Sequence, residues 1–186
     1  MRGDWTKAEK LIQDARAIKI EIGDKRGEAM VIHNLGNICR DRGDERKAEK
    51  LYRECISILQ EIGDRRLEAV AILNLAGVIN NMDETKRLFS DCLEISREVG
   101  DRHLEADSLN NLGIVAMHLG ELNEAQSLLN DSLVLKRRIG NVIGLPKTLR
   151  NLGNVTAALG DSKKAEKYFS EAEKILSQMV RSTKDE

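Results

Sequence analysis

The side chains that most often carry chemistry in proteins are few and scattered in this sequence. They are His33, His103 and His118, with Cys39, Cys55 and Cys92. A metal site or a nucleophile–base pair needs several such groups to converge, and no two of the cysteines form a CxxC pair. The signatures GxxxxGK[ST], GxGxxG, HExxH and GxSxG are also absent. The sequence therefore predicts a protein that is not an enzyme and that needs no cofactor and no metal.

Asparagine, by contrast, recurs with its neighbours at a fixed spacing. Asn-Leu-Gly stands at 34–36, 111–113 and 151–153, and Asn-Leu-Ala stands at 74–76, so the steps are 40, 37 and 40 residues. A Gly-Asp or Gly-Asn pair after an aliphatic residue, first seen at Gly23-Asp24, follows the same steps. A second glycine series stands at Gly3, Gly43, Gly120 and Gly160. Glycine series in phase with a third motif indicate internal repeats.

Each unit is expected to contain two helices joined by turns of glycine and aspartate. Glycine just past a helix end adopts a left-handed conformation at low cost, and the following aspartate caps the next helix. Apolar residues at helical spacing support each segment, as in Ala48, Leu51, Cys55 and Leu59. We expect helices at 4–22, 25–42, 44–62, 65–80, 83–99, 102–119, 121–139, 142–159 and 161–180.

The predicted fold class is an all-α superhelix, that is, an alpha-alpha solenoid of about nine antiparallel helices. We expect a single domain, 1–186, built from a half repeat and four repeats with a disordered tail. The boundaries are 1–24, 25–64, 65–101 (three residues short), 102–141, 142–180 and the tail 181–186. Arg2-Gly3-Asp4 is interpreted as a turn between helices, as at Arg42-Gly43-Asp44, and the chain is expected to start half a unit into a repeat.

Charge and composition exclude several classes of partner. The formal net charge is −1 with no basic block, so we expect neither nucleic acid nor an anionic membrane surface to bind. No apolar run approaches the roughly 20 residues of a membrane span. The odd number of cysteines and the absence of a signal peptide favour a reducing compartment and a cytoplasmic location.

The repeat pattern resembles the tetratricopeptide repeat (TPR) family. The second unit matches with Ile32, Leu35-Gly36, Cys39, Ala48, Tyr52 and Cys55, and the last with Leu149, Leu152-Gly153, Thr156, Ala165, Phe169 and Ala172. The third unit departs, because Ala76 replaces the glycine and Thr85 the alanine. A unit of 40 residues is longer than the usual 34. It is similar to the variant in kinesin light chains, Leu-Gly-Asn repeat adaptors and prokaryotic signalling proteins.

This resemblance implies a non-catalytic scaffold that binds a protein or peptide in a concave groove lined by the first helix of each pair. The groove positions it implies are Met30, His33, Asn37, Arg40, Leu73, Asn74, Asn110, Asn111, Ile114, Met117, Lys147, Arg150 and Asn154. The repeated asparagines fit two interpretations: they bind the backbone of a partner peptide, or they bond within the repeat.

Within that groove, the pattern of cations disfavours one family-specific site and suggests another partner. The residues predict no chaperone-type carboxylate clamp, because Asp107 stands where a lysine would be needed. Lys147 and Arg150 instead favour a partner with an acidic feature near the last unit.

The first helix is expected to lack a partner on one side. Its apolar residues are Trp5, Leu11, Ile12, Ala15 and Ile18, and they predict a possible homo-oligomer through the exposed end. Two alternatives to a free-standing scaffold therefore stay open. One is a sensor or regulatory segment of a larger, prokaryotic signalling or transcription-regulatory protein, and the other is a self-associating structural module.

Overall fold

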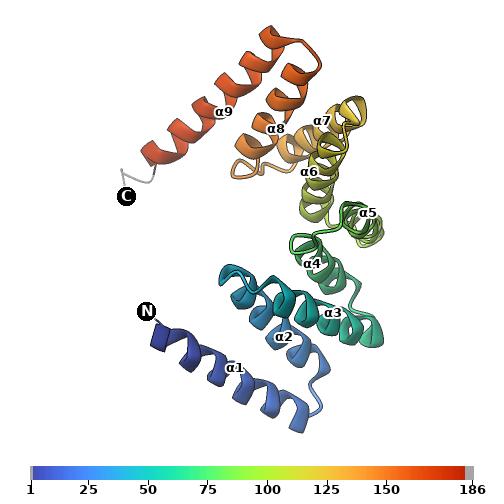
Figure 1. The fold of residues 1–186 in the computed structure, drawn as a ribbon, viewed down its shortest axis with the longest axis vertical. Coiled ribbons are helices and arrows are strands. Elements are labelled where there is room, and N and C mark those ends of the chain that lie inside the picture. The colour runs from blue at the N-terminus through green and yellow to red at the C-terminus, as the bar shows by residue number, and fades with distance from the viewer. Residues whose placement is uncertain (1, 183–186) are drawn as a thin grey trace. The chain divides into compact units, whose positions relative to one another are not determined.

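The structure is a computed structural model that describes the backbone of residues 2–182 and the side chains of residues 10–181. This part of the chain is helical throughout, apart from the turns, and contains nine helices (Figure 1). They are α1 (Arg2–Glu21), α2 (Lys25–Asp41), α3 (Glu45–Ile62), α4 (Arg65–Ala76), α5 (Met82–Glu98), α6 (Arg102–His118), α7 (Leu122–Arg138), α8 (Leu145–Ala158) and α9 (Ser162–Ser182). The all-α fold and its helix count follow the prediction.

The turns form by the predicted chemistry. Seven glycines have positive φ, among them Gly23 (70°) and Gly63 (71°), and each follows a helix end. Asp24, Asp44, Asp64 and Asp101 then cap the next helix by accepting a hydrogen bond from the backbone N–H three residues on. Asn81 plays the same part for α5. Each cap satisfies one N–H group that the helix itself leaves without a partner.

Three of the differences between the predicted and the observed helix boundaries have identifiable reasons. The fourth helix ends at Ala76 rather than at residue 80, because the three-residue loss removes the glycine turn and residues 77–81 form the connection instead. The eighth begins at Leu145 rather than at 142, with Pro146 in its first turn and Asn141 bonded to the Gly144 N–H. At the N-terminus, α1 already includes Arg2-Gly3-Asp4, so the first glycine lies within the helix and not in a turn.

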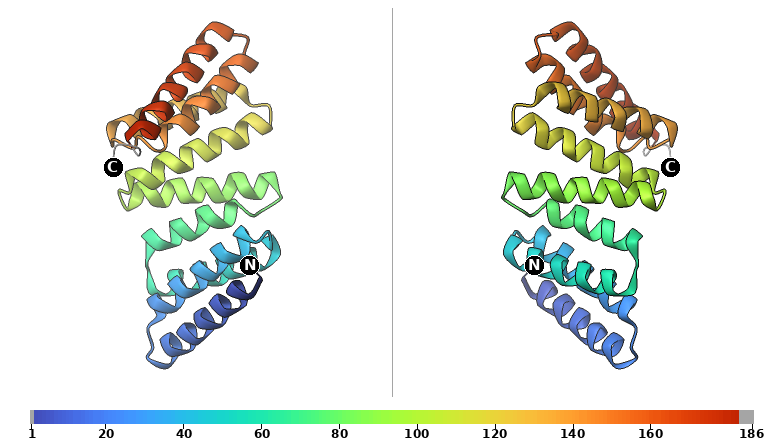
Figure 2. Two further views of the ribbon diagram at one scale, coloured as in Figure 1. Left: turned by 90° about the vertical axis from the view of Figure 1, so that its left-hand side faces the viewer. Right: turned by 90° about the vertical axis from the view of Figure 1, so that its right-hand side faces the viewer.

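The chain divides into two compact units, residues 1–99 and 100–186. In unit 1, α2 packs on α3 and α4 on α5; in unit 2, α6 packs on α7 and α8 on α9 (Figure 2). We call α2, α4, α6 and α8 the first helices of these pairs. Residues 183–186, which fall in the predicted tail, lie outside the described part, and α9 continues through Ser182.

In three of the four pairs, a repeat glycine allows close contact between the two helices. A Cβ on Gly36 would lie 2.7 Å from the Tyr52 ring, and one on Gly153 would lie 2.4 Å from the Phe169 ring. Gly113 approaches the fully buried Leu129 in the same way. In these three repeats the Leu-Gly therefore sets how closely the two helices pack, and through it the direction in which the first helix presents its open side chains.

Candidate partner-binding site

In unit 1, the open side of α2 borders a small apolar cavity. A volume of about 80 Å³ lies between α2, α3 and α4. Met30, His33 and Asn34 come from α2, Cys55 and Leu59 from α3, and Leu67 and Val70 from α4, with Ala29 completing the wall. Met30 is 47% exposed, so the cavity has an edge that a partner can contact. A cavity of this size and character suits one aliphatic side chain.

His33 connects α2 to α4 through its ring. Arg40, which has only donors, donates to Oδ1 of Asn74 at 3.2 Å, so the Asn74 amide nitrogen faces His33. That nitrogen lies 2.7 Å from His33 Nε2, which must therefore accept, and the imidazole is neutral. Burial lowers the pKa of His33, and the charge of Arg40 lowers it further, although a hydrogen bond from the ring to Asn34 opposes both. Asn74 thus bonds within the repeat array.

Two further predicted groove residues of α2 are also engaged. The Tyr52 hydroxyl donates to Oδ1 of Asn37 at 2.8 Å, which holds Asn37 against α3. Arg40 forms an ion pair with Asp41 at 3.0 Å in addition to its bond to Asn74. The polar side chains of α2 therefore form a fixed frame around the cavity.

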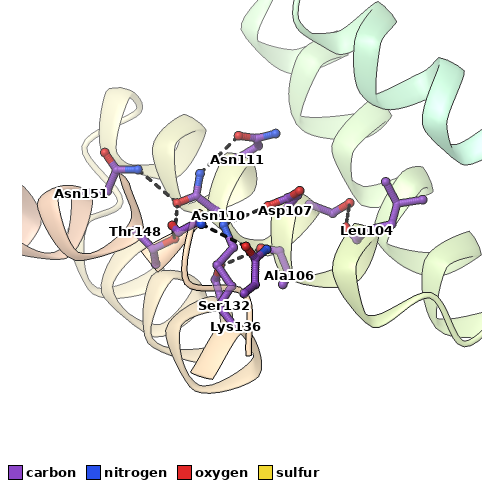
Figure 3. Close-up of polar contacts among 12 residues, drawn as sticks. Leu104, Ala106, Asp107, Asn110, Asn111, Ser132, Lys136, Thr148 and Asn151 are labelled. Carbon is purple, nitrogen blue, oxygen red and sulfur yellow. Dashed lines mark hydrogen bonds and ion pairs between the residues drawn. The ribbon is translucent and has the colours of Figure 1, made fainter. Parts of the chain in front are cut away.

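In unit 2, the corresponding network centres on Asn110 (Figure 3). This residue is only 1% exposed, and its Oδ1 accepts from Thr148 Oγ1 and from Asn151 Nδ2, each at 3.1 Å. Its own amide donates to Asn111 Oδ1 at 3.3 Å. Asn110 stands three residues before its repeat glycine, as His33 does, and Asn151 matches Asn74. The same bond therefore joins successive first helices in both units.

A buried ion pair lies beside this network. Lys136 on α7 is 2% exposed, and its Nζ lies 2.9 Å from Oδ1 of Asp107 on α6 (Figure 3). Asp107 itself is about half exposed on the open side of α6. Because Lys136 neutralises this carboxylate, the first-helix side chains of unit 2 carry no unpaired acid among the predicted groove positions. The sequence gives no signal for this pair, because the repeat position of Lys136 is held by Leu59 in the second repeat and by Ser96 in the third.

The open side of α8 differs from that of α2 and α6. Lys147, Arg150 and Asn154 are exposed, and together with Asn151 they line a hollow of about 350 Å³. Ile143, Pro146 and Leu176 supply its apolar wall. Within the described residues, Lys147 and Arg150 form no ion pair and no hydrogen bond. The two cations that the sequence places toward the C-terminal end of a groove thus border the same hollow.

The remaining predicted residues are less accessible. Leu73, Asn111, Ile114 and Met117 are half-buried on α4 and α6. Of the self-association residues, Leu11 and Ile18 are 60% and 56% exposed, whereas Ile12 and Ala15 are half-buried. The side chain of Trp5 lies outside the described residues. The apolar face of α1 is therefore only partly open.

The cysteines pack in the core. Cys55 and Cys92 occupy the same repeat slot, and their Sγ atoms donate to the carbonyls of Ala29 and Ala69 at 3.3 and 3.2 Å. Ser132 occupies that slot in unit 2 and donates to the Ala106 carbonyl at 2.7 Å. Burial raises the pKa of Cys55 to about 12, which suppresses its thiolate. Among the described residues, no three His, Cys, Asp or Glu side chains are grouped as metal ligands, and no helix is long and apolar enough to cross a membrane.

Both units contain paired helices that touch at a Leu-Gly. A comparison of the sequence with models of protein families gives a matching result. The model for the tetratricopeptide repeat matches residues 1–61, 67–138 and 105–178. The chain belongs to the tetratricopeptide repeat family. No curated protein matches it in sequence.

Solved structures share the fold at low sequence identity. BtubC (BKLC) from P. vanneervenii is 24% identical with a TM-score of 0.87, over 96% of this chain and 76% of that one. The apo form of RapI is 22% identical with a TM-score of 0.84, over 95% of this chain and 50% of that one. Kinesin light chain-like repeats from Podosopora anserina are 16% identical with a TM-score of 0.73, over 97% and 90%. These TPR solenoids establish the fold of the chain.

Proposed function

We propose that this TPR chain is a non-catalytic scaffold that binds a protein or peptide segment on the open sides of its first helices. One observation carries the proposal: equivalent repeat positions line a hollow in each unit. Met30, His33 and Asn34 line the cavity of unit 1, and Lys147, Arg150 and Asn151 line the hollow of unit 2. A general fold does not fix a function, but a repeated, preformed hollow with polar groups around it is typical of a binding surface.

The proposed mechanism is presentation by a rigid surface. Hydrogen bonds from Asn74 to His33 and from Asn151 to Asn110 hold α4 to α2 in unit 1 and α8 to α6 in unit 2. A partner that meets a preformed surface loses less free energy in ordering the site, which favours binding. In unit 1, we expect an aliphatic side chain of the partner to enter the cavity beside Met30.

The test uses a displayed library of random 12-residue peptides, followed by calorimetric titration of the enriched ones. Met30→Glu places a charge at the edge of the cavity and should abolish binding of peptides that depend on an aliphatic residue. The matched control is Met82→Glu, because Met82 on α5 is 45% exposed and lines none of the hollows described above. Equal binding by both variants would show that the cavity is not used.

A second candidate function is self-association through α1, favoured by the exposure of Leu11, Ile18 and Ile22. Light scattering over a hundredfold range of concentration tests it, with Leu11→Glu and Ile18→Glu as the disrupting pair. A constant monomer mass would exclude this role at those concentrations.

A regulatory segment of a larger protein is the remaining candidate, and it is supported by the match to half the length of RapI. Reading the coding sequence on both sides of this chain tests it. We propose a cytoplasmic location, because Cys39, Cys55 and Cys92 are buried without forming a disulfide.

A further inference from the structure

In each unit, one first helix offers a hydrogen-bond acceptor to the first helix that follows it: α2 to α4 in unit 1, and α6 to α8 in unit 2. His33 Nε2 accepts from Asn74 in unit 1, and Asn110 Oδ1 accepts from Asn151 in unit 2. The donor is the repeat asparagine, and the acceptor stands three residues before the repeat glycine of the preceding unit. This contact seats one helix on the pair before it, as α4 sits on α2 and α3.

At the same position α8 carries Arg150, which offers hydrogen-bond donors where His33 and Asn110 offer an acceptor. A guanidinium group has five donors and no acceptor, so it cannot receive a bond from an asparagine amide. Three residues earlier, Lys147 on α8 stands at the repeat position that Met30 holds on α2 and Asp107 holds on α6. Its ammonium group also has only donors. A helix seated on α8 and α9 in the same way must therefore present acceptors, and a carboxylate is the acceptor that also satisfies the two charges.

We propose that the open surface of α8 and α9 binds an acidic amphipathic helix, seated as α4 is seated on α2 and α3. The positions that match Val70 and Asn74 would be Glu or Asp, which face Lys147 and Arg150 respectively. These positions are four residues apart and thus lie on one face of the helix. The inference rests on the proposed scaffold function and names the chemistry of its partner.

The apolar part of the surface supports a helix rather than another polyanion. Leu176 stands at the repeat position of Leu59, which lines the cavity between α2 and α4, and Leu176 is 42% exposed. Ile143, at the edge of the hollow, is 80% exposed. A strand of nucleic acid would pair with the two cations and leave these side chains uncovered, whereas an amphipathic helix covers both kinds of group.

The experiment uses the full chain and a labelled peptide of residues 64–77 as the probe, since in the protein this segment forms α4 with its Asp64 cap. Three forms are compared by fluorescence anisotropy: unchanged, V70E/N74E, and V70K/N74K. The acidic form should bind about tenfold more tightly than the unchanged form, and its affinity should fall as salt is raised. The lysine form should not bind.

Charge reversal supplies the decisive control. The protein variant Lys147→Glu with Arg150→Glu should lose the acidic peptide and gain the lysine peptide. Lys163→Glu with Lys167→Glu makes the same charge change at two residues of α9 that do not line the hollow, and should leave binding unchanged. Circular dichroism of each variant confirms that it is folded.

Each outcome bears on a different claim. Equal or absent binding of the three peptide forms, or the same affinity after charge reversal, overturns the acidic-helix proposal; so does tighter binding of a 12-nucleotide single strand than of the acidic peptide. If random-library peptides are still enriched through Met30, the scaffold function survives that failure. If neither the library nor the helix peptides bind, both are wrong.

Discussion

The ammonium group of Lys136 on α7 lies 2.9 Å from the carboxylate of Asp107 on α6, although Lys136 is only 2% exposed. In unit 1 the place of Lys136 is taken by Leu59, which is equally buried. Desolvating an ammonium group is costly, so the pair stabilises unit 2 only while the carboxylate remains. Its two members should therefore respond very differently to substitution.

We expect Asp107→Ala to lower the free energy of unfolding by about 3 kcal/mol, because it leaves Lys136 buried without its partner. Lys136→Met should cost less than about 1 kcal/mol, because the remaining Asp107 is half exposed to water. Urea unfolding followed by circular dichroism measures both. Equal losses in the two variants would contradict this account of the pair.

The repeat glycines provide a second prediction. Gly153→Ala should lower the free energy of unfolding by about 2 kcal/mol, since its Cβ would lie 2.4 Å from the Phe169 ring and force the helices apart. Gly77→Ala serves as the control: its nearest neighbour would be 3.4 Å away, and its φ of −73° suits alanine. That change should be neutral or stabilise by up to about 1 kcal/mol. Thermal unfolding distinguishes the two.

Much of the fold could be predicted from sequence because its signals are local. A glycine followed by Asp24 or Asp64 specifies a turn and a cap without help from the rest of the chain, and both appear as predicted. The early end of α4 was harder to place, because the unit around residue 80 has lost its glycine. There, Asn81 supplies the cap from a connection that the periodicity does not describe.

The candidate site was less predictable, because a residue's position in the repeat does not tell whether its side chain is already hydrogen-bonded within the protein. Asn110 was expected in the groove, yet it is buried and bonded to Thr148 and Asn151. Lys136 was not expected anywhere near it. Such pairings join residues that are about 30 to 40 positions apart. They depend on which side chain the neighbouring helix places opposite a given lysine or asparagine.

Acidification should weaken unit 1 through His33. Burial holds the pKa of this imidazole lower in the folded protein than in the unfolded chain. As the pH falls, the unfolded chain therefore binds the proton before the folded protein does. The stability that comes from neutral His33 is therefore complete above the unfolded pKa and is lost as the pH falls through the folded pKa. Urea midpoints at pH 7.5 and 5.5 should differ in the wild type.

His33→Asn should reduce that difference in midpoint, since Asn110 fills the same role in unit 2 without titrating. The control is His118→Asn on the exposed end of α6, which should keep the wild-type pH dependence. A His33→Asn protein with the full wild-type pH dependence would show that His33 does not cause it.

The cysteine slot can be tested by exchange between units. Cys55→Ser should be tolerated, because Ser132 already donates to a helix carbonyl from the equivalent position. Cys55→Val removes the donor and adds a branched side chain beside Ala29, and should lower the free energy of unfolding by about 1 to 2 kcal/mol. Thiol labelling gives an independent check: with its pKa raised to about 12 and its side chain buried, Cys55 should react only after denaturant is added. Fast labelling of Cys55 in the native protein at pH 8 would mean that α2 and α3 separate readily, which the close contact of Gly36 with Tyr52 argues against.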